Sequence, residues 1–189
     1  MEPTINFPDI HPILETARLN LKPPTLADAR DFFEIRSNRE FMKYIGRHPI
    51  THISEAEKYI QRILDGFNSR TGLSWKICEK GSDKLIGYIG FWSIDYTHFR
   101  TEIGYGLHQD YHRKGYLTEA LNTLTHFTFN ELGLHSVLAD ADVKNVATIK
   151  LLEKCGFKKE AHFKESFYFD GEFLDSAIYC KVKISTNSI

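Results

Sequence analysis

Two spacings of apolar residues run along this chain, and each predicts one kind of element. Alternation of apolar and polar residues indicates strands, whereas apolar residues three to four positions apart indicate helices. Proline and glycine mark several of the ends, as at Pro23-Pro24 and Gly133. In chain order the patterns predict a strand at 18–22, helices at 25–38 and 54–68, strands at 73–79, 84–94 and 99–108, a helix at 115–131, a strand at 135–140, a helix at 145–155, and strands at 157–169 and 172–184.

Short signals support the ends of these elements. Ser54, followed by Glu57 three residues later, is typical of a capping box at a helix start. Asp170-Gly171 is a strong two-residue turn signal and predicts that the last two strands form a hairpin. The order βααβββαβαββ predicts one α/β (mixed α+β) domain over 1–189. Its central sheet should be mixed but mostly antiparallel, with helices on both faces. We expect residues 1–12 and 185–189 to be loose ends.

Composition excludes several classes of protein. The 189 residues hold 24 Lys and Arg against 25 Asp and Glu, and this near balance argues against a general nucleic-acid binder. The three cysteines form no CxxC pair, which predicts reduced thiols rather than a disulfide framework. The start of the chain shows no signal-peptide pattern, and the longest apolar run, about 85–92, is far too short to span a bilayer. We therefore predict a cytoplasmic protein with no nucleic-acid or membrane partner.

The segment 112–118, His-Arg-Lys-Gly-Tyr-Leu-Thr, lies between a predicted strand and a predicted long helix. The N–H groups and the dipole at a helix start bind anions, and Gly115 allows a phosphate to approach the backbone closely. Arg113 and Lys114 add positive charge. A basic surface turn explains the same segment without any ligand, and that reading is favoured when the segment is taken alone.

Two further segments carry candidate chemistry. In 101–107, Thr-Glu-Ile-Gly-Tyr-Gly-Leu, Glu102 shares a strand face with Gly104 and Gly106. Glycines in a strand often mark a bulge or the close approach of a ligand, so Glu102 is a candidate general base. A solvated strand glutamate is an equally good reading. Asn145 begins the helix at 145–155, where a simple N-cap explains it fully.

Taken together and in this order, these segments resemble the GNAT superfamily of acyl-CoA-dependent N-acyltransferases. The resemblance is greatest to the branch that contains the ribosomal-protein N-terminal acetyltransferases, and it extends over about 13–183. It implies the fold predicted above. It also implies acetyl-CoA as co-substrate, an amine acceptor that is a protein N-terminus or a small molecule, and direct transfer without a metal.

The resemblance assigns the pyrophosphate loop to positions His112, Gly115 and Leu117. His112 stands where the family has Gln or Arg, Leu117 where it has a small residue, and Arg113 where this branch often has glycine. In the family, the bulged fourth strand binds the pantetheine arm, and a helix-start asparagine contacts the cofactor. The implied cofactor-binding set is therefore Tyr105, Gly106, Leu107, His112, Arg113, Lys114, Gly115, Tyr116, Leu117, Thr118 and Asn145.

The same resemblance implies the catalytic residues. Glu102 stands where some members have a general base, and an amine that is mostly protonated at neutral pH needs one. Thr148 stands where relatives carry a serine near the sulfur and is the candidate proton donor to the thiolate. Tyr168 is a second candidate for that role.

Other readings stay open or are set aside. His108 and His112 have the spacing of a zinc helix but lack its glutamate, so we predict no metal site. We expect Trp75 and Trp92 in the core and the charges of 36–43 on a solvated face. A non-catalytic acyl-CoA-binding module and a peptide-binding surface on the C-terminal hairpin are the alternatives to an enzyme. The chain is predicted to be a monomer or a homodimer.

Overall fold

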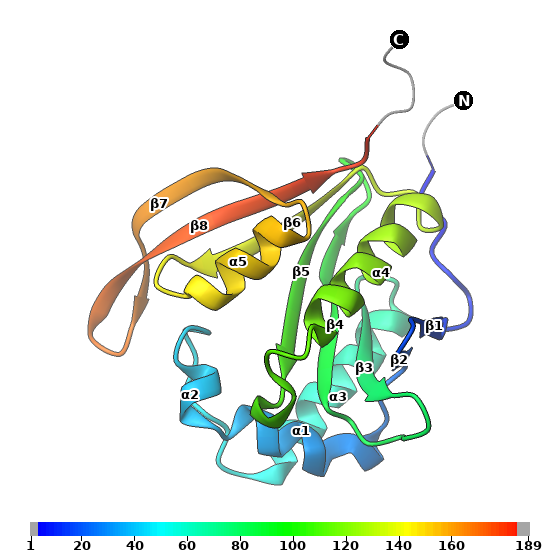
Figure 1. The fold of residues 1–189 in the computed structure, drawn as a ribbon, viewed down its shortest axis with the longest axis horizontal. Helices are drawn as coiled ribbons and strands as arrows, with labels where there is room; N and C mark the ends of the chain where they lie inside the picture. Colours follow the sequence, from blue (N-terminus) through cyan, green and yellow to red (C-terminus); the bar gives the residue numbers. More distant parts are fainter. Residues whose placement is uncertain (1–3, 185–189) are drawn as a thin grey trace.

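The computed structural model describes residues 4–184 and contains one sheet of eight strands (Figure 1). The strands lie in the order β1-β2-β3-β4-β5-β6-β8-β7, and every neighbouring pair is antiparallel except β5 and β6. The predicted mixed, mostly antiparallel sheet is therefore confirmed. The elements are β1 (Leu14–Glu15), β2 (Leu19–Lys22), the 3-10 helix η1 (Leu26–Asp28), α1 (Ala29–Arg36), α2 (Arg39–Met42), α3 (Ile53–Asn68), β3 (Leu73–Glu79), β4 (Gly87–Asp95), β5 (Arg100–Leu107), the 3-10 helix η2 (Gln109–Tyr111), α4 (Tyr116–Asn130), β6 (Ser136–Asp142), α5 (Val146–Lys154), β7 (Lys158–Phe169) and β8 (Glu172–Val182).

The helices cover both faces of the sheet, as predicted (Figure 1). α4 and α5 pack on one face over the larger core, where the Trp75 and Phe127 rings meet edge to face with centroids 5.7 Å apart. α1 and α3 pack on the other face, over a smaller core that includes Phe32, Ile60 and Tyr88. Burial of these apolar side chains is the main source of the free energy that holds the helices on the sheet.

The N-terminal helices differ from the prediction. The region 25–38 holds η1 and α1, and a further short helix, α2, follows. α3 begins at Ile53, because the Glu55 carboxylate accepts hydrogen bonds from the N–H groups of Thr51 and His52 at 2.9 and 3.0 Å. The predicted Ser54–Glu57 capping box is therefore wrong by two residues: the N-cap is His52, and Glu55 takes the place expected for Glu57.

The expectation of a loose N-terminal end is wrong for the residues that the structure describes. Phe7 is buried in the larger core, and the Asn6 N–H donates to the Leu132 carbonyl at 2.9 Å. The Trp75 indole N–H donates to the Pro12 carbonyl at 2.7 Å. These contacts fix residues 4–12 along the molecule, whereas 1–3 and 185–189 lie outside the described residues.

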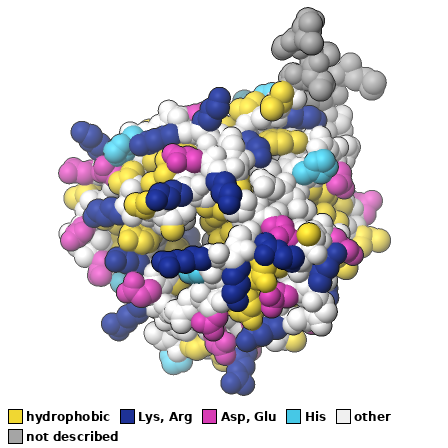
Figure 2. Space-filling view, in the orientation of Figure 1, with side chains coloured by type: hydrophobic (Ala, Val, Ile, Leu, Met, Phe, Trp, Pro, Cys, Tyr) yellow, Lys and Arg dark blue, Asp and Glu magenta, His cyan; other side chains and the backbone are white. Residues whose placement is uncertain are grey.

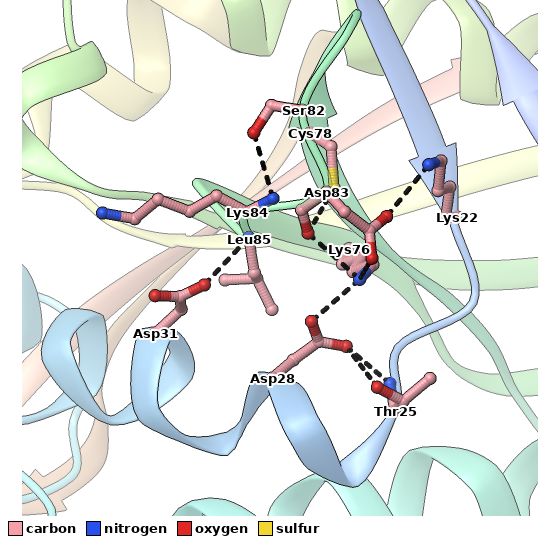
Figure 3. Close-up of polar contacts among 10 residues, drawn as sticks. All are labelled: Lys22, Thr25, Asp28, Asp31, Lys76, Cys78, Ser82, Asp83, Lys84 and Leu85. Atoms are coloured by element: carbon pink, nitrogen blue, oxygen red, sulfur yellow. Dashed lines mark hydrogen bonds and ion pairs between the residues drawn. The ribbon is translucent and has the colours of Figure 1, made fainter.

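A buried polar cluster joins the start of α1 to the sheet (Figure 3). Lys76 on β3 forms an ion pair with Asp28 at 2.8 Å, and both side chains are almost fully buried. Burial alone would lower the pKa of Lys76, but hydrogen bonding and charge attraction from Asp28 outweigh it and raise the pKa. Asp28 also accepts from the Thr25 N–H at 2.7 Å. The cluster therefore fixes where α1 begins and how it lies on the sheet.

The three cysteines, Cys78, Cys155 and Cys180, are buried free thiols. Within 4–184, no helix combines the length and the apolar character needed to cross a bilayer.

Candidate active site

β5 and β6 diverge along their length (Figure 1), and a large cleft lies where they part. The two parallel strands pair only from Arg100–Glu102 to the facing residues 136–138. From Ile103 onward, the edge of β5 that faces β6 has no strand partner among the described residues. The cleft at this fork has a volume of about 1410 Å³. Figure 2 shows a hollow on this face of the molecule, with Lys and Arg side chains around it. Unpaired backbone N–H and C=O groups at such an edge are ready to bind an extended ligand.

The start of α4 forms one end of the cleft. Gly115 is the N-cap residue with a φ of 81°, and Arg113 is also left-handed, with a φ of 60°. No side chain caps this helix, so the first-turn N–H groups at Tyr116, Leu117 and Thr118 remain available. All three residues line the cleft. An uncapped helix start with a nearby arginine is a ready anion site.

An exposed arginine outside the cleft supports this loop from behind. The Arg18 guanidinium donates to the Lys114 carbonyl at 3.0 Å and to the Glu119 carboxylate at 2.8 Å. Burial alone would raise the pKa of Glu119, but hydrogen bonds from Thr16 and Arg18 outweigh it and lower the pKa. The one acidic group of the first helical turn is thus held by Arg18. Lys114 does not line the cleft, unlike the other predicted loop residues.

The start of α5 lines another part of the cleft. The Asn145 side-chain oxygen accepts from the Thr148 N–H at 3.1 Å, so the N-cap reading of Asn145 is confirmed. Both residues line the cleft. The nearby Tyr105 hydroxyl is buried and has no hydrogen-bond partner among the described residues. Burial raises the pKa of Tyr105, and the neighbouring Thr148 hydroxyl acts in the opposite direction.

Two carboxylates stand at the fork. Glu102 is in the last pair that β5 forms with β6, and Asp140 lies two residues beyond its partner Leu138. Burial is the main cause that raises the pKa of Glu102, and the negative charge of Asp140 raises it further. Burial likewise raises the pKa of Asp140. A carboxylate with a raised pKa in a cleft is suited to accept a proton from an amine.

The glycine face of β5 is covered by the protein's own aromatic rings. A side chain at Gly104 would collide with the Trp92 indole, and one at Gly106 would place its Cβ 2.6 Å from Phe41 and 2.8 Å from Tyr88. The predicted bulge does exist, but it lies in β4 between Phe91 and Ser93, not in β5. Trp92, the extra residue, is therefore turned into the cleft and is 41% exposed, so its expected core position is wrong.

Most of the predicted site residues meet in this cleft. Its lining includes Glu102, Tyr105, Gly106, Leu107, His112, Arg113, Gly115, Tyr116, Leu117, Thr118, Asn145 and Thr148. Tyr168 does not line it, because its ring is 62% exposed and packs on Phe173 in the hairpin, while the preceding Phe167 faces the cleft. The His112 ring is held by the Leu107 carbonyl at 2.9 Å. Within 4–184, no three His, Cys, Asp or Glu side chains are grouped to bind a metal.

The N-terminal helices build part of the cleft, as the resemblance implies, and Phe41 and Tyr44 line it, but two charged residues of the site were missed. Arg36 was expected on a solvated face, but it is only 6% exposed and reaches the cleft beside Tyr59. Asp140 was also missed, because it comes near Glu102 only through the pairing of β5 with β6, two strands that are not consecutive elements of the chain. Arg36 lies four residues after Phe32 and seven after Ala29, both buried, and this helical spacing is the signal that indicates an inward-facing arginine.

Comparison with known proteins decides the family. The family model described as "Acetyltransferase (GNAT) domain" matches residues 18–158. The chain belongs to the GNAT acetyltransferases. This GNAT enzyme is therefore an acyltransferase, an acetyl-CoA-dependent N-acetyltransferase. An uncharacterized N-acetyltransferase YoaA of Bacillus subtilis (strain 168) is 34% identical over 172 residues, which cover 91% of this chain and 97% of the relative.

More distant relatives have named acceptors. A spermidine N(1)-acetyltransferase of Vibrio cholerae is 27% identical over 84% of this GNAT chain and 90% of its own. Among solved structures, the RimL ribosomal L7/L12 alpha-N-protein acetyltransferase in complex with coenzyme A superposes with a TM-score of 0.81. That structure shares 18% identity and covers 90% of this chain and 98% of its own. At that identity the superposition establishes the fold.

Proposed function

We propose that this enzyme transfers an acetyl group from acetyl-CoA directly to a primary amine, with the pyrophosphate at the start of α4. The observation that carries the proposal is one continuous cleft holding three features. These are the uncapped start of α4, the unpaired edge of β5 and the Glu102 carboxylate. Arg113, Lys150 and Lys154 line the same cleft and supply positive charge for phosphates. The fit of these groups supports acetyl-CoA as the donor.

The roles of the lining residues follow from their chemistry. Backbone N–H groups along β5, at Tyr105 to Leu107, hold the pantetheine arm and polarise the acyl carbonyl, since they are fixed in place before reaction. Acetyl-CoA supplies an activated acyl group with a thiolate leaving group. Glu102 removes the proton that the ammonium form of the acceptor must lose before it can attack. Asn145, already bonded to Thr148, holds the start of α5 against the cofactor.

Two hydroxyl groups are placed to protonate the departing thiolate. Thr148 lines the cleft at the start of α5. The Tyr105 hydroxyl is buried beside it, has no partner among the described residues, and stays protonated because burial raises its pKa. Tyr168, on the exposed part of the hairpin, is less well placed for this step.

The acceptor is a primary amine, either a protein N-terminus or a small molecule. Relatives are named for both kinds, a spermidine acetyltransferase and a ribosomal uS5 alanine acetyltransferase of Escherichia coli (strain K12). The cleft has a volume of about 1410 Å³, and its hairpin wall at Ser166 and Phe167 is exposed at the surface.

Thermal unfolding with acetyl-CoA, with free CoA and with neither tests this proposal first. A ligand at about 100 times its Kd stabilises the folded state by about 2.7 kcal/mol, which is a readable shift in Tm. We expect shifts with both ligands, followed by CoA release when amines are added to the acetyl-CoA sample. Absence of any shift at millimolar acetyl-CoA would contradict the cofactor site. A shift without release from any amine would instead indicate a non-catalytic acyl-CoA-binding module.

A further inference from the structure

Three arginines surround one aromatic ring in the cleft, on the side away from the start of α4. Arg36 on α1 and Arg62 on α3 place their guanidinium carbons 4.7 and 5.2 Å from the Tyr59 ring centre. Arg47, after α2, is the third, and all three line the cleft. We propose that this arginine cluster, Arg36, Arg47 and Arg62, binds a carboxylate or phosphate carried by the amine acceptor. The inference rests on the proposed acetyl transfer and names its substrate class.

The buried member of the cluster gives the strongest evidence. Arg36 is only 6% exposed, and the one hydrogen bond of its side chain to a described residue is donated to the Tyr88 hydroxyl at 2.8 Å. Its Nε is buried without a partner. A guanidinium has five N–H donors and cannot lose its charge, so burial without an anion is costly. Because Arg36 also lines the cleft, an anion bound there would compensate its positive charge.

No carboxylate in the described part of the chain is paired with the cluster. None of the three arginines forms an ion pair with an acidic group anywhere in 4–184. Glu40 lines the same part of the cleft but is not paired with them. Burial is the main cause that raises the pKa of Tyr59, and the charges of all three arginines oppose it, in keeping with their places around its ring. Like charges held this closely repel one another, and an oxyanion between them removes that repulsion.

The cluster lies on the acceptor side of the fork. The Tyr59 and Trp92 rings meet edge to face with centroids 5.6 Å apart, and Trp92 in turn covers Gly104, two residues from Glu102. Glu102 and Asp140 thus attract the ammonium end of an acceptor, and the arginine cluster attracts an anionic end across the aromatic rings. The substrate class that fits is a primary amine that also bears a carboxylate or phosphate. A polyamine, with positive charges only, fits poorly.

Matched acceptors test this inference through CoA release. We compare β-alanine with β-alaninamide, O-phosphoethanolamine with ethanolamine, and both pairs with spermidine. Charge-assisted hydrogen bonds of ordinary strength predict that kcat/KM is at least about tenfold higher for the charged member of a pair. The two pairs also tell a carboxylate from a phosphate. Preference for the neutral members or for spermidine would overturn the proposal.

Variants of the exposed arginines show whether the cluster causes the preference. Arg47→Ala with Arg62→Ala should raise KM for the charged acceptor about tenfold, with a smaller effect on kcat, and remove most of the selectivity. Arg39→Ala removes the same charge from a nearby exposed position outside the cleft and should leave the selectivity unchanged. An equal loss for charged and neutral acceptors in the double variant would overturn the proposal. Arg36→Lys, which keeps the charge but loses the planar donors, should weaken the same preference.

Equilibrium binding separates this inference from the proposed function. Succinate and inorganic phosphate are titrated into the wild-type protein and the double variant by calorimetry. If the affinity for either anion weakens about tenfold in the double variant, the arginine cluster is supported as an anion site. If no amine is turned over in the same preparation, only the proposed acetyl transfer fails. Turnover without selectivity and without anion binding would overturn the cluster and leave acetyl transfer intact.

Discussion

The two walls of the cleft are built in different ways. The cofactor wall comes largely from two short segments, the loop 112–118 that starts α4 and the start of α5. The acceptor wall draws on single side chains from α1, α3, β4, β5 and the hairpin, which lie far apart in the sequence. The first wall works mainly through backbone N–H groups, and the second through side-chain charge and aromatic rings.

This difference explains why the residues of the cofactor wall could be predicted from the sequence, whereas several residues of the acceptor wall could not. A helix start with Gly115 is largely a local feature, because the turn and the free N–H groups of the first helical turn are set mainly by neighbouring residues. Arg36, Tyr59 and Trp92 acquire their positions only when α1 and α3 pack on β4. Their meeting is a property of the tertiary structure.

The largest expected effect is at the boundary between the walls, at Glu102. Glu102→Gln keeps the shape but removes the base, so kcat should fall by about 10²–10⁴-fold. Acetyl-CoA should still raise Tm as in the wild type, because the loop that holds its phosphates is unchanged. Glu172→Gln, in the exposed hairpin, is the matched control and should keep full activity. Equal activity of the two variants would remove Glu102 from the mechanism.

The next largest effect is on the free energy of unfolding, at the ion pair that anchors α1 beneath the acceptor wall. Asp28→Asn leaves Lys76 buried without its closest carboxylate, and breaking a buried pair costs about 3–5 kcal/mol of unfolding free energy. Denaturant unfolding measures this loss. Asp83→Asn removes the second, exposed partner of Lys76 and should cost no more than about 1 kcal/mol. Similar losses in both variants would show that the Lys76–Asp28 pair does not anchor α1.

A smaller effect on stability is expected at Gly115, in the cofactor wall, together with weaker binding of acetyl-CoA. Gly115→Ala forces a side chain into a left-handed conformation, at a cost of about 1–2 kcal/mol, and should weaken acetyl-CoA binding. Gly81→Ala meets the same restriction at a φ of 84°, in a turn outside the cleft. The two variants should therefore lose similar stability, while only Gly115→Ala loses the Tm shift with acetyl-CoA. Equal shifts would exclude the start of α4 from the phosphate site.

The smallest effect is a change in pH dependence. Glu102 must be ionised to accept a proton, and burial together with Asp140 raises its pKa, so kcat should fall on the acid side at a pH above the ordinary value for glutamate. Asp140→Asn removes the negative charge that helps to raise the pKa of Glu102. The acid limb of the pH profile of kcat should therefore move to lower pH by about one unit or less. Asp142→Asn, in the same cleft, should leave the limb in place. An acid limb unmoved by Asp140→Asn would mean that the two carboxylates do not interact.

Regular elements were largely predictable, and irregular ones were not. The hairpin turn at Asp170-Gly171 is confirmed, with both residues at positive φ, since the dipeptide itself favours that conformation. The short β1 was missed, because two residues show no alternation. The start of α3 was misplaced because His52 with Glu55 and Ser54 with Glu57 have the same spacing, and the hydrogen bonds from Thr51 and His52 to Glu55 show that the first pair forms.

The sequence by itself determined the order of elements, the mostly antiparallel sheet, the family resemblance and the helix-start loop. All of these depend on local spacing and turn chemistry. Only the tertiary structure decided that β5 and β6 part after Glu102, that Trp92 faces the cleft, and that Arg36 is buried among aromatic rings. These features depend on packing between residues tens of positions apart, and a linear pattern of polar and apolar residues does not record which distant groups meet.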